Sequence, residues 1–318
     1  MLRKLPKYLS KCYSSYPMGG GVVRSKTITE LKTKYHAQEP ITMITAHDFI
    51  TASWAQSAGC DMILVGDSLA TNALGYESTT QIGLEEFQYH VQSVCRAQGA
   101  AFIMADMPFG TFESSIEKGV ETAIALMKSS PKVGGVKLEV GSTSGALREQ
   151  DYSLKLAAAL CSRGIPVMGH VGLTPQRAHA LSGFKVQGSK SAKDAAAIYQ
   201  TAHELQDLGC FGILLECVPH KVSKHITESL SVPTIGIGAG NGVSGQVLVQ
   251  SDLLGMNLGK IPKLAQKYGD LHEQSVGFIQ QYLEDVASQR FPDNDRNGFK
   301  IKDDVWGDFL DLVGNSSK

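Results

Sequence analysis

Short apolar runs alternate with amphipathic segments along most of the chain. The runs are rich in Val, Ile, Leu and Met, a composition typical of strands buried on both faces of a parallel sheet. The segments between them space apolar residues three or four apart, as a helix with one buried face does. The predicted strands cover residues 41–45, 62–67, 101–105, 135–139, 165–170, 212–216, 233–237 and, more weakly, 246–250.

Helices are predicted between these strands and on both sides of them. Thr27 and Glu30 have the spacing of a helix-capping box, so we expect the folded part to begin there. The later helices are predicted up to residue 58, at 83–95, 114–127, around 154–158, and at 194–208, 220–230, 270–288 and 306–312. A strand and a helix repeated eight times favour a single α/β fold, the (β/α)8 TIM barrel.

A doubly wound open sheet is the alternative fold, but its first unit would carry Gly-x-Gly-x-x-Gly, and that motif is missing here. We expect three regions: a leader at 1–26, a catalytic barrel at 27–292 and a polar C-terminal extension at 293–318.

Composition narrows the class of protein. The chain has 318 residues, 42% of them hydrophobic, which is enough for a large core. A net charge of −1 gives no sign of nucleic-acid binding. No apolar run approaches the roughly 20 residues that span a bilayer, so we expect no membrane partner. The six cysteines show neither zinc nor disulfide spacing. Cys217 follows Glu216, but a buried thiol is the favoured interpretation, because no histidine stands at a spacing that would activate it.

The N-terminus has the composition of a mitochondrial presequence. It contains no acid before Glu30, several serines, and the basic residues Arg3, Lys4, Lys7, Lys11, Arg24 and Lys26. We therefore expect a mitochondrial location. The alternative is a basic tail with no targeting function.

Four of the apolar runs end at a carboxylate, and this pattern is the main functional signal. The acids are Asp67, Asp106, Glu139 and Glu216. In a barrel, strand ends share one face, so these acids are expected to meet there with Ser68, Lys137 and His170. A single strand-end acid is more often a salt bridge or a helix cap. Four at equivalent positions favour a site.

Several carboxylates in one place repel each other unless a cation neutralises them, and oxygen-only ligands suit Mg²⁺. Such a metal would stabilise the enolate of a 2-oxo acid, while another carboxylate removes the proton. The spacing does not say which acid is that base. Lys137 either binds substrate or pairs with an acid, and His170 is either structural or directly involved. The glycine cluster at 236–240 is explained equally well by phosphate binding or by close backbone packing.

Ordered sequence blocks resemble one known family across about residues 27–292. The blocks lie at 65–68, 105–109, 136–139, 169–176, 184–188, 215–219 and 235–240. They read VGDS, ADMPF, VKLE, GHVGLTPQ, FKVQG, LECVP and IGIGAG. Together they resemble the ketopantoate hydroxymethyltransferase family.

The resemblance implies a barrel of the phosphoenolpyruvate/pyruvate superfamily and an early step towards pantothenate and coenzyme A. In that step, 5,10-methylenetetrahydrofolate donates a one-carbon unit to 3-methyl-2-oxobutanoate. By matching motif, the implied Mg²⁺ ligands are Asp67, Asp106 and Glu139, and the implied base is Glu216. Ser68 and Lys137, with Asp67 and Asp106, would contact the oxo acid, and a homo-oligomer, a decamer, is implied.

Two departures from the family pattern concern folate handling. Ser182 and Phe184 stand where Gly and Tyr are expected, and residues 76–82 match loosely. Two other classes stay open. A carbon–carbon lyase of the same superfamily would share the barrel and the metal. A non-catalytic barrel would tolerate the loss of acids that are all present here.

Overall fold

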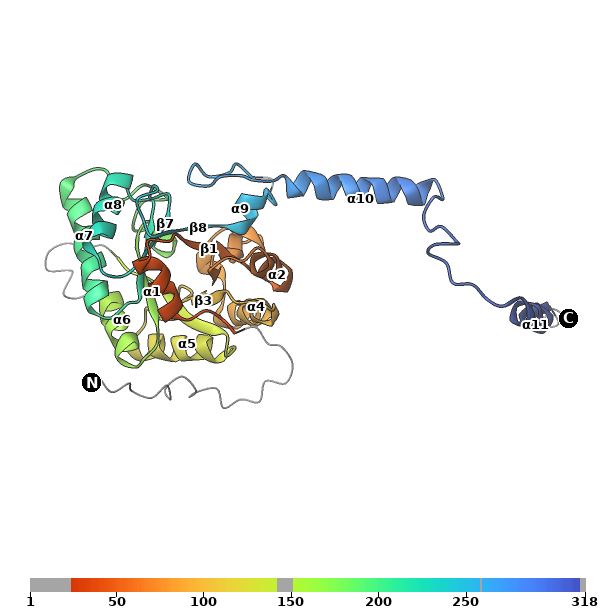
Figure 1. Ribbon diagram of the computed structural model, residues 1–318, viewed down its shortest axis with the longest axis horizontal. Helices are drawn as coiled ribbons and strands as arrows, with labels where there is room; N and C mark the ends of the chain where they lie inside the picture. The colour runs from red at the N-terminus through yellow and green to blue at the C-terminus, as the bar shows by residue number, and fades with distance from the viewer. Residues whose placement is uncertain (1–23, 142–150, 258, 315–318) are drawn as a thin grey trace, which may run out of the picture. The chain divides into compact units, whose positions relative to one another are not determined.

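The computed structural model describes residues 24–141, 151–257 and 259–314, so most of the expected leader lies outside it. Eight parallel strands close into a barrel in the order of the sequence, which confirms the predicted (β/α)8 fold (Figure 1). The strands are β1 Ile41–Thr45, β2 Met62–Val65, β3 Phe102–Asp106, β4 Val133–Glu139, β5 Val167–Gly172, β6 Gly212–Glu216, β7 Thr234–Ile237 and β8 Gly245–Leu248.

Helices follow the strands around the barrel. They are α1 Ile28–His36, α2 Phe49–Ser57, α3 Leu69–Asn72, α4 Leu84–Arg96, α5 Ile116–Lys128, α6 Tyr152–Ser162, α7 Ala192–Asp207, α8 His220–Ser229 and α9 Gln250–Leu254. Short 3-10 turns lie at Thr79–Gln81 and Pro175–Arg177. Hydrophobic spacing did not predict α3 and α9, because a helix of about one turn shows no period. The predicted capping box is present: Thr27 accepts from the Glu30 amide, and Glu30 accepts from the Thr27 amide.

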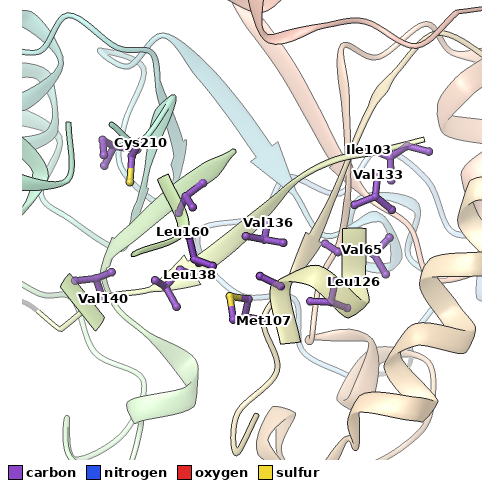
Figure 2. Close-up of a cluster of buried hydrophobic side chains, with 14 of the residues drawn as sticks. Val65, Ile103, Met107, Leu126, Val133, Val136, Leu138, Val140, Leu160 and Cys210 are labelled. Atoms are coloured by element: carbon purple, nitrogen blue, oxygen red, sulfur yellow. The ribbon is translucent and has the colours of Figure 1, made fainter. Parts of the chain in front are cut away.

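The side chains on the two faces of each strand pack into different hydrophobic clusters. Met62, Leu64, Phe102 and Met104 belong to a cluster that fills the barrel, and the strand residues that alternate with them belong to another cluster. The second cluster packs the barrel against its helices, as Val136, Leu138 and Leu160 illustrate in Figure 2. Because side chains alternate along a strand, the first cluster shows which positions of each strand face the barrel interior.

Helix α1 packs at the end of the barrel where the strands begin. Its Leu31 is buried in the interior cluster, and the Tyr35 hydroxyl donates to the Leu230 carbonyl at 3.0 Å. Asp61, just before β2, accepts from the ammonium groups of Lys26 and Lys34, each at 2.7 Å. These bonds connect the segment before α1 and α1 itself to the start of β2.

Contacts divide the chain into two compact units. One contains the residues up to Leu253 and Gly259–Lys267, and the other contains Leu254–Leu258 and Tyr268–Lys318. The second unit holds α10, Leu271–Ala287, and α11, Asp303–Gly314, neither of which has a buried residue. The boundaries expected at 27 and 292 stay a prediction. Within the described residues, no helix has the length and apolar character needed to cross a membrane.

Candidate active site

The strand-end acids meet inside the barrel mouth because of strand parity. On β3, Phe102 and Met104 point inward, so Asp106 does too. On β4, Val136 and Leu138 belong to the outer cluster, so Lys137 and Glu139, which alternate with them, point inward. Register then sets neighbours side by side: Asp106 pairs with Lys137, and Glu139 with His170.

A chain of polar contacts runs across three strands and ends at β6. The Lys137 Nζ lies 2.8 Å from Asp106 Oδ1 and 3.2 Å from His170 Nδ1. On the other side of the ring, His170 Nε2 faces Glu216 Oε2 at 3.3 Å. The Lys137 and His170 side chains are almost fully buried, whereas Glu216 is 17% exposed. Among these contacting side chains, Glu216 is therefore the one that an entering substrate can reach.

Gln176 also contacts the acids, although it was not among the site residues predicted from the sequence. Its amide nitrogen Nε2 donates to Asp67 Oδ2 at 2.8 Å and to the Met107 carbonyl at 2.9 Å. Its backbone N–H donates to Glu139 Oε2 at 3.0 Å. The only signal in the sequence was its place in the block at 169–176, because an uncharged amide does not mark a strand end as an acid does.

Burial and crowding change the protonation of this cluster. Burial, and then the nearby Asp106 carboxylate, raise the pKa of Asp67 to about 7. Burial also raises the pKa of Glu139 well above its ordinary value, although Lys137 opposes that effect. Burial alone would lower the pKa of Lys137, but the carboxylates of Asp106, Glu139 and Asp67 together raise it. Lys137 is thus a buried cation beside Asp67 and Glu139, the two acids whose pKa values are raised.

The imidazole of His170 is neutral in this setting. Burial lowers its pKa, and the adjacent Lys137 ammonium lowers it further. An ammonium beside Nδ1 can only donate, so the imidazole proton belongs on Nε2, the nitrogen that faces Glu216. His170 is therefore arranged to orient the Glu216 carboxylate.

The structure also describes the surroundings of the other residues singled out from the sequence. Ser68 lies with the acids: a Cβ on Gly66 would be 3.2 Å from Ser68 Oγ and 3.5 Å from Asp106 Oδ2. Cys217 is buried, and burial raises the pKa of its thiol to about 11, which supports the non-nucleophilic interpretation. At Gly240 a Cβ would lie 2.4 Å from His220 Cβ, so close packing accounts for this glycine. Phe184 is 71% exposed.

The donor set suits a hard divalent cation. Asp67, Asp106 and Glu139 supply oxygen ligands only, and the buried Glu139 Oε1 has no hydrogen-bond partner. In the described part of the chain, no three Asp, Glu, His or Cys side chains are already spaced to hold a metal. The Lys137 ammonium occupies the cationic position beside Asp106. The carboxylates fit Mg²⁺ by chemistry, and binding it would require their oxygens to converge.

Fold and site together define a TIM-barrel enzyme with a buried cluster of acids at the ends of its strands. The model of the family described as ketopantoate hydroxymethyltransferase matches residues 25–294. The chain is 51% identical over 292 residues to a protein of Saccharomyces cerevisiae named 3-methyl-2-oxobutanoate hydroxymethyltransferase, with 92% of each chain covered. A protein of the same name from Emericella nidulans is 43% identical, with 91% of this chain and 81% of that protein covered. The chain belongs to the ketopantoate hydroxymethyltransferase family.

Solved structures resemble the chain at the level of the fold. A putative phosphonomutase from Burkholderia cenocepacia matches with a TM-score of 0.55 and 14% identity, over 82% of this chain and 98% of its own. Phosphonopyruvate hydrolase in complex with oxalate and Mg²⁺ matches with a TM-score of 0.54 and 12% identity, over 92% and 96%. These likenesses agree with the TIM-barrel fold.

Proposed function

We propose that this chain transfers a one-carbon unit from 5,10-methylenetetrahydrofolate to 3-methyl-2-oxobutanoate, giving 2-dehydropantoate on the route to pantothenate and coenzyme A. The observation that carries the proposal is the meeting of Asp67, Asp106, Glu139 and Glu216 around Lys137, in a chain of this family. The family match favours this transfer over the lyase considered above.

The oxo acid is bound by the inner part of the cluster. Asp67, Asp106 and Glu139 would hold Mg²⁺, which when bound polarises the oxo group and stabilises the enolate. Lys137 stays charged and buried, so its ammonium attracts the substrate's anionic oxygens. Ser68, beside Asp106, supplies a hydroxyl for a further hydrogen bond. Gln176 holds Asp67 and Glu139 in place through its side chain and its backbone N–H.

Glu216 removes the proton from C3 of the oxo acid. It is the acid most open to the barrel mouth, and it has the neutral His170 imidazole behind it to orient its carboxylate. Loss of that proton forms the enolate, whose C3 then attacks the one-carbon unit.

The test of this role is the exchange of the C3 hydrogen of 3-methyl-2-oxobutanoate in D₂O, which needs no folate. Glu216→Gln keeps the shape and hydrogen bonding of the side chain but cannot accept the proton. We expect the oxo acid to bind and exchange to fall by about 10²-fold or more. Glu228→Gln, on the exposed face of α8, is the matched control. Exchange at the wild-type rate in Glu216→Gln would rule out Glu216 as the base, and His170 would be tested next.

Location in mitochondria is the second part of the proposal, supported by the basic, acid-free start of the chain. Residues 1–35 fused to a fluorescent protein should bring it into mitochondria. The same fusion with Arg3, Lys4, Lys7 and Lys11 changed to Gln should stay in the cytosol. A diffuse signal from the unchanged leader would contradict the proposal.

Assembly is the third part. The family resemblance supports a homo-oligomer, a decamer, with small molecules as the other partners. The mass of the purified protein in solution, measured by light scattering, tests this directly, and a monomer would contradict it.

A further inference from the structure

A small cavity lies beside the acids, where β1, β2 and β8 end. His47, Gly66, Ser68, Asn72 and Ser251 are among its lining residues. It offers about 10 Å³ to the centre of a water molecule, close to what one water requires. The Ser251 hydroxyl is buried and has no hydrogen-bond partner. A polar cavity of this size with an unpartnered hydroxyl is suited to one bound water.

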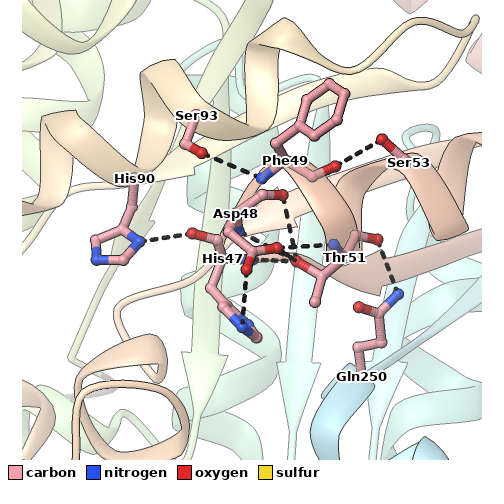
Figure 3. Close-up of polar contacts among 8 residues, drawn as sticks. All are labelled: His47, Asp48, Phe49, Thr51, Ser53, His90, Ser93 and Gln250. Carbon is pink, nitrogen blue, oxygen red and sulfur yellow. Dashed lines mark hydrogen bonds and ion pairs between the residues drawn. The ribbon is translucent and has the colours of Figure 1, made fainter. Parts of the chain in front are cut away.

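His47 lines this cavity, and Figure 3 shows its polar contacts with neighbouring residues. The backbone carbonyl oxygen of His47 lies 2.6 Å from His90 Nδ1, and this contact anchors the end of β1. The His47 ring nitrogen Nε2 faces Asp48 Oδ2 at 3.8 Å. The other oxygen of Asp48, Oδ1, accepts from the amide and the hydroxyl of Thr51, each at 2.7 Å. Asp48 is therefore immobilised as the cap of α2 and cannot turn away from His47.

Gln250, the residue before Ser251, is hydrogen-bonded to the end of β1 and to α2. The Gln250 N–H donates to Thr45 Oγ1 at 3.0 Å, and Gln250 Nε2 donates to the Thr51 carbonyl at 3.2 Å. These bonds join the segment after β8 to the end of β1 and to α2, and they fix the residue next to Ser251, which lines the same cavity as His47.

His47 is neutral and can accept a proton. Burial lowers the pKa of its imidazole; Asp48 raises it, and His90 lowers it further. With Nε2 turned towards Asp48, Nδ1 is the ring nitrogen left to accept. The side chain is 19% exposed, so its ring is not sealed from the barrel mouth.

The atom balance of the reaction calls for a water. The donor carries a methylene group, and the product carries a hydroxymethyl group, so one oxygen and two hydrogens must enter from solvent. This requirement rests on the function proposed above. None of the roles given to Glu216, Lys137 or the metal ligands supplies that water.

We propose that the cavity between β1, β2 and β8 binds the reacting water and that His47 is the base that activates it. The water oxygen bonds to the methylene carbon of the donor, and one carbon–nitrogen bond breaks, leaving its electron pair on the folate nitrogen. His47 takes the proton from the oxygen and returns it to that nitrogen. The resulting N-hydroxymethyl group then collapses to tetrahydrofolate and formaldehyde, which the enolate attacks.

Two half-reactions separate this role from that of Glu216. Exchange of the C3 hydrogen in D₂O needs neither folate nor the bound water, whereas formation of 2-dehydropantoate needs both. In His47→Gln we expect product formation to fall by about 10²-fold and exchange to stay within about twofold of wild type. His36→Gln, on α1 away from the strand ends, is the matched control and should change neither.

A second variant tests the cavity itself and leaves His47 in place. Ser251→Val puts methyl groups where the water would sit, so product formation should again fall while exchange continues. Circular dichroism establishes that each variant is folded. Product formation at the wild-type rate in folded His47→Gln or Ser251→Val overturns the inference, and so does a parallel loss of exchange, which would indicate a structural role. A wild-type protein that exchanges C3 hydrogen but makes no folate-dependent product would instead overturn the proposed function.

Discussion

Asp61 and Asp67 stand on either side of strand β2 and are equally buried, each 4% exposed, yet they differ in charge. Asp61 accepts hydrogen bonds from Lys26, Lys34 and Thr42, and these outweigh burial and lower its pKa to about 2. Burial raises the pKa of Asp67 to about 7 and the like-charged Asp106 adds to that rise, whereas Lys137 and the hydrogen bond from Gln176 oppose it.

The supply of positive charge contributes to this difference in pKa. At the end of the barrel where the strands begin, Lys26 and Lys34 both form ion pairs with Asp61. At the other end, Lys137 stands among Asp67, Asp106 and Glu139. An acid with enough partners stabilises the fold, whereas acids short of positive charge are destabilised until a cation or a substrate arrives. Three experiments test that contrast.

The largest effect is expected at the end of the barrel that is short of positive charge. Asp106→Ala removes a proposed Mg²⁺ ligand and the partner of Lys137, so turnover should fall by about 10³-fold or more while the barrel stays folded. Mg²⁺ titration, turnover and circular dichroism measure the three properties. Asp207→Ala, on the exposed end of α7, is the control. Unchanged Mg²⁺ affinity in the folded variant would remove Asp106 from the metal site.

The opposite end should respond in stability rather than activity. Asp61→Asn leaves Lys26 and Lys34 without a counter-charge, and the free energy of unfolding should fall by about 2–3 kcal/mol. Turnover should be unchanged, because Asp61 lies at the other end of β2 from the acids. Urea denaturation of both proteins gives the comparison. An unchanged midpoint would show that the two ion pairs contribute nothing net.

The smallest effect is the pH dependence of that stabilisation. The folded-state pKa of Asp61, about 2, lies below its ordinary value of 3.8, so its contribution is complete well above pH 4. It is lost as the pH falls through the folded value, and about half remains near pH 3. The stability difference between wild type and Asp61→Asn should therefore shrink as pH drops from 7 to 3. A difference that stays constant would assign the effect to packing.

Much of this architecture could be predicted from the sequence. All eight apolar runs became strands, because a strand buried on both faces leaves few other assignments. The convergence of the acids followed from the barrel, and strand parity would have added that Asp106, Lys137 and Glu139 all face inward.

Other features depended on tertiary contacts. Asp61 and Asp67 look alike in sequence, since each adjoins the same apolar run, and the lysines that distinguish Asp61 come from positions 26 and 34. Gln176 joins acids on different strands only once the barrel has closed. His47 could not be predicted as a site residue, because neither Asp48, the next residue, nor Ser251, which lines the same cavity, forms a sequence motif with it.

The link between Lys26 and the barrel also limits where a leader can be removed. The expected leader ends at residue 26, but the Lys26 N–H donates to the Ala100 carbonyl at 2.7 Å and its ammonium binds Asp61. A protease that trimmed the chain after Lys26 would take away one of the two cations that stabilise Asp61. Where a leader is removed, we therefore expect the product to keep Lys26, and an N-terminal residue found after Lys26 would mark a species less resistant to denaturation.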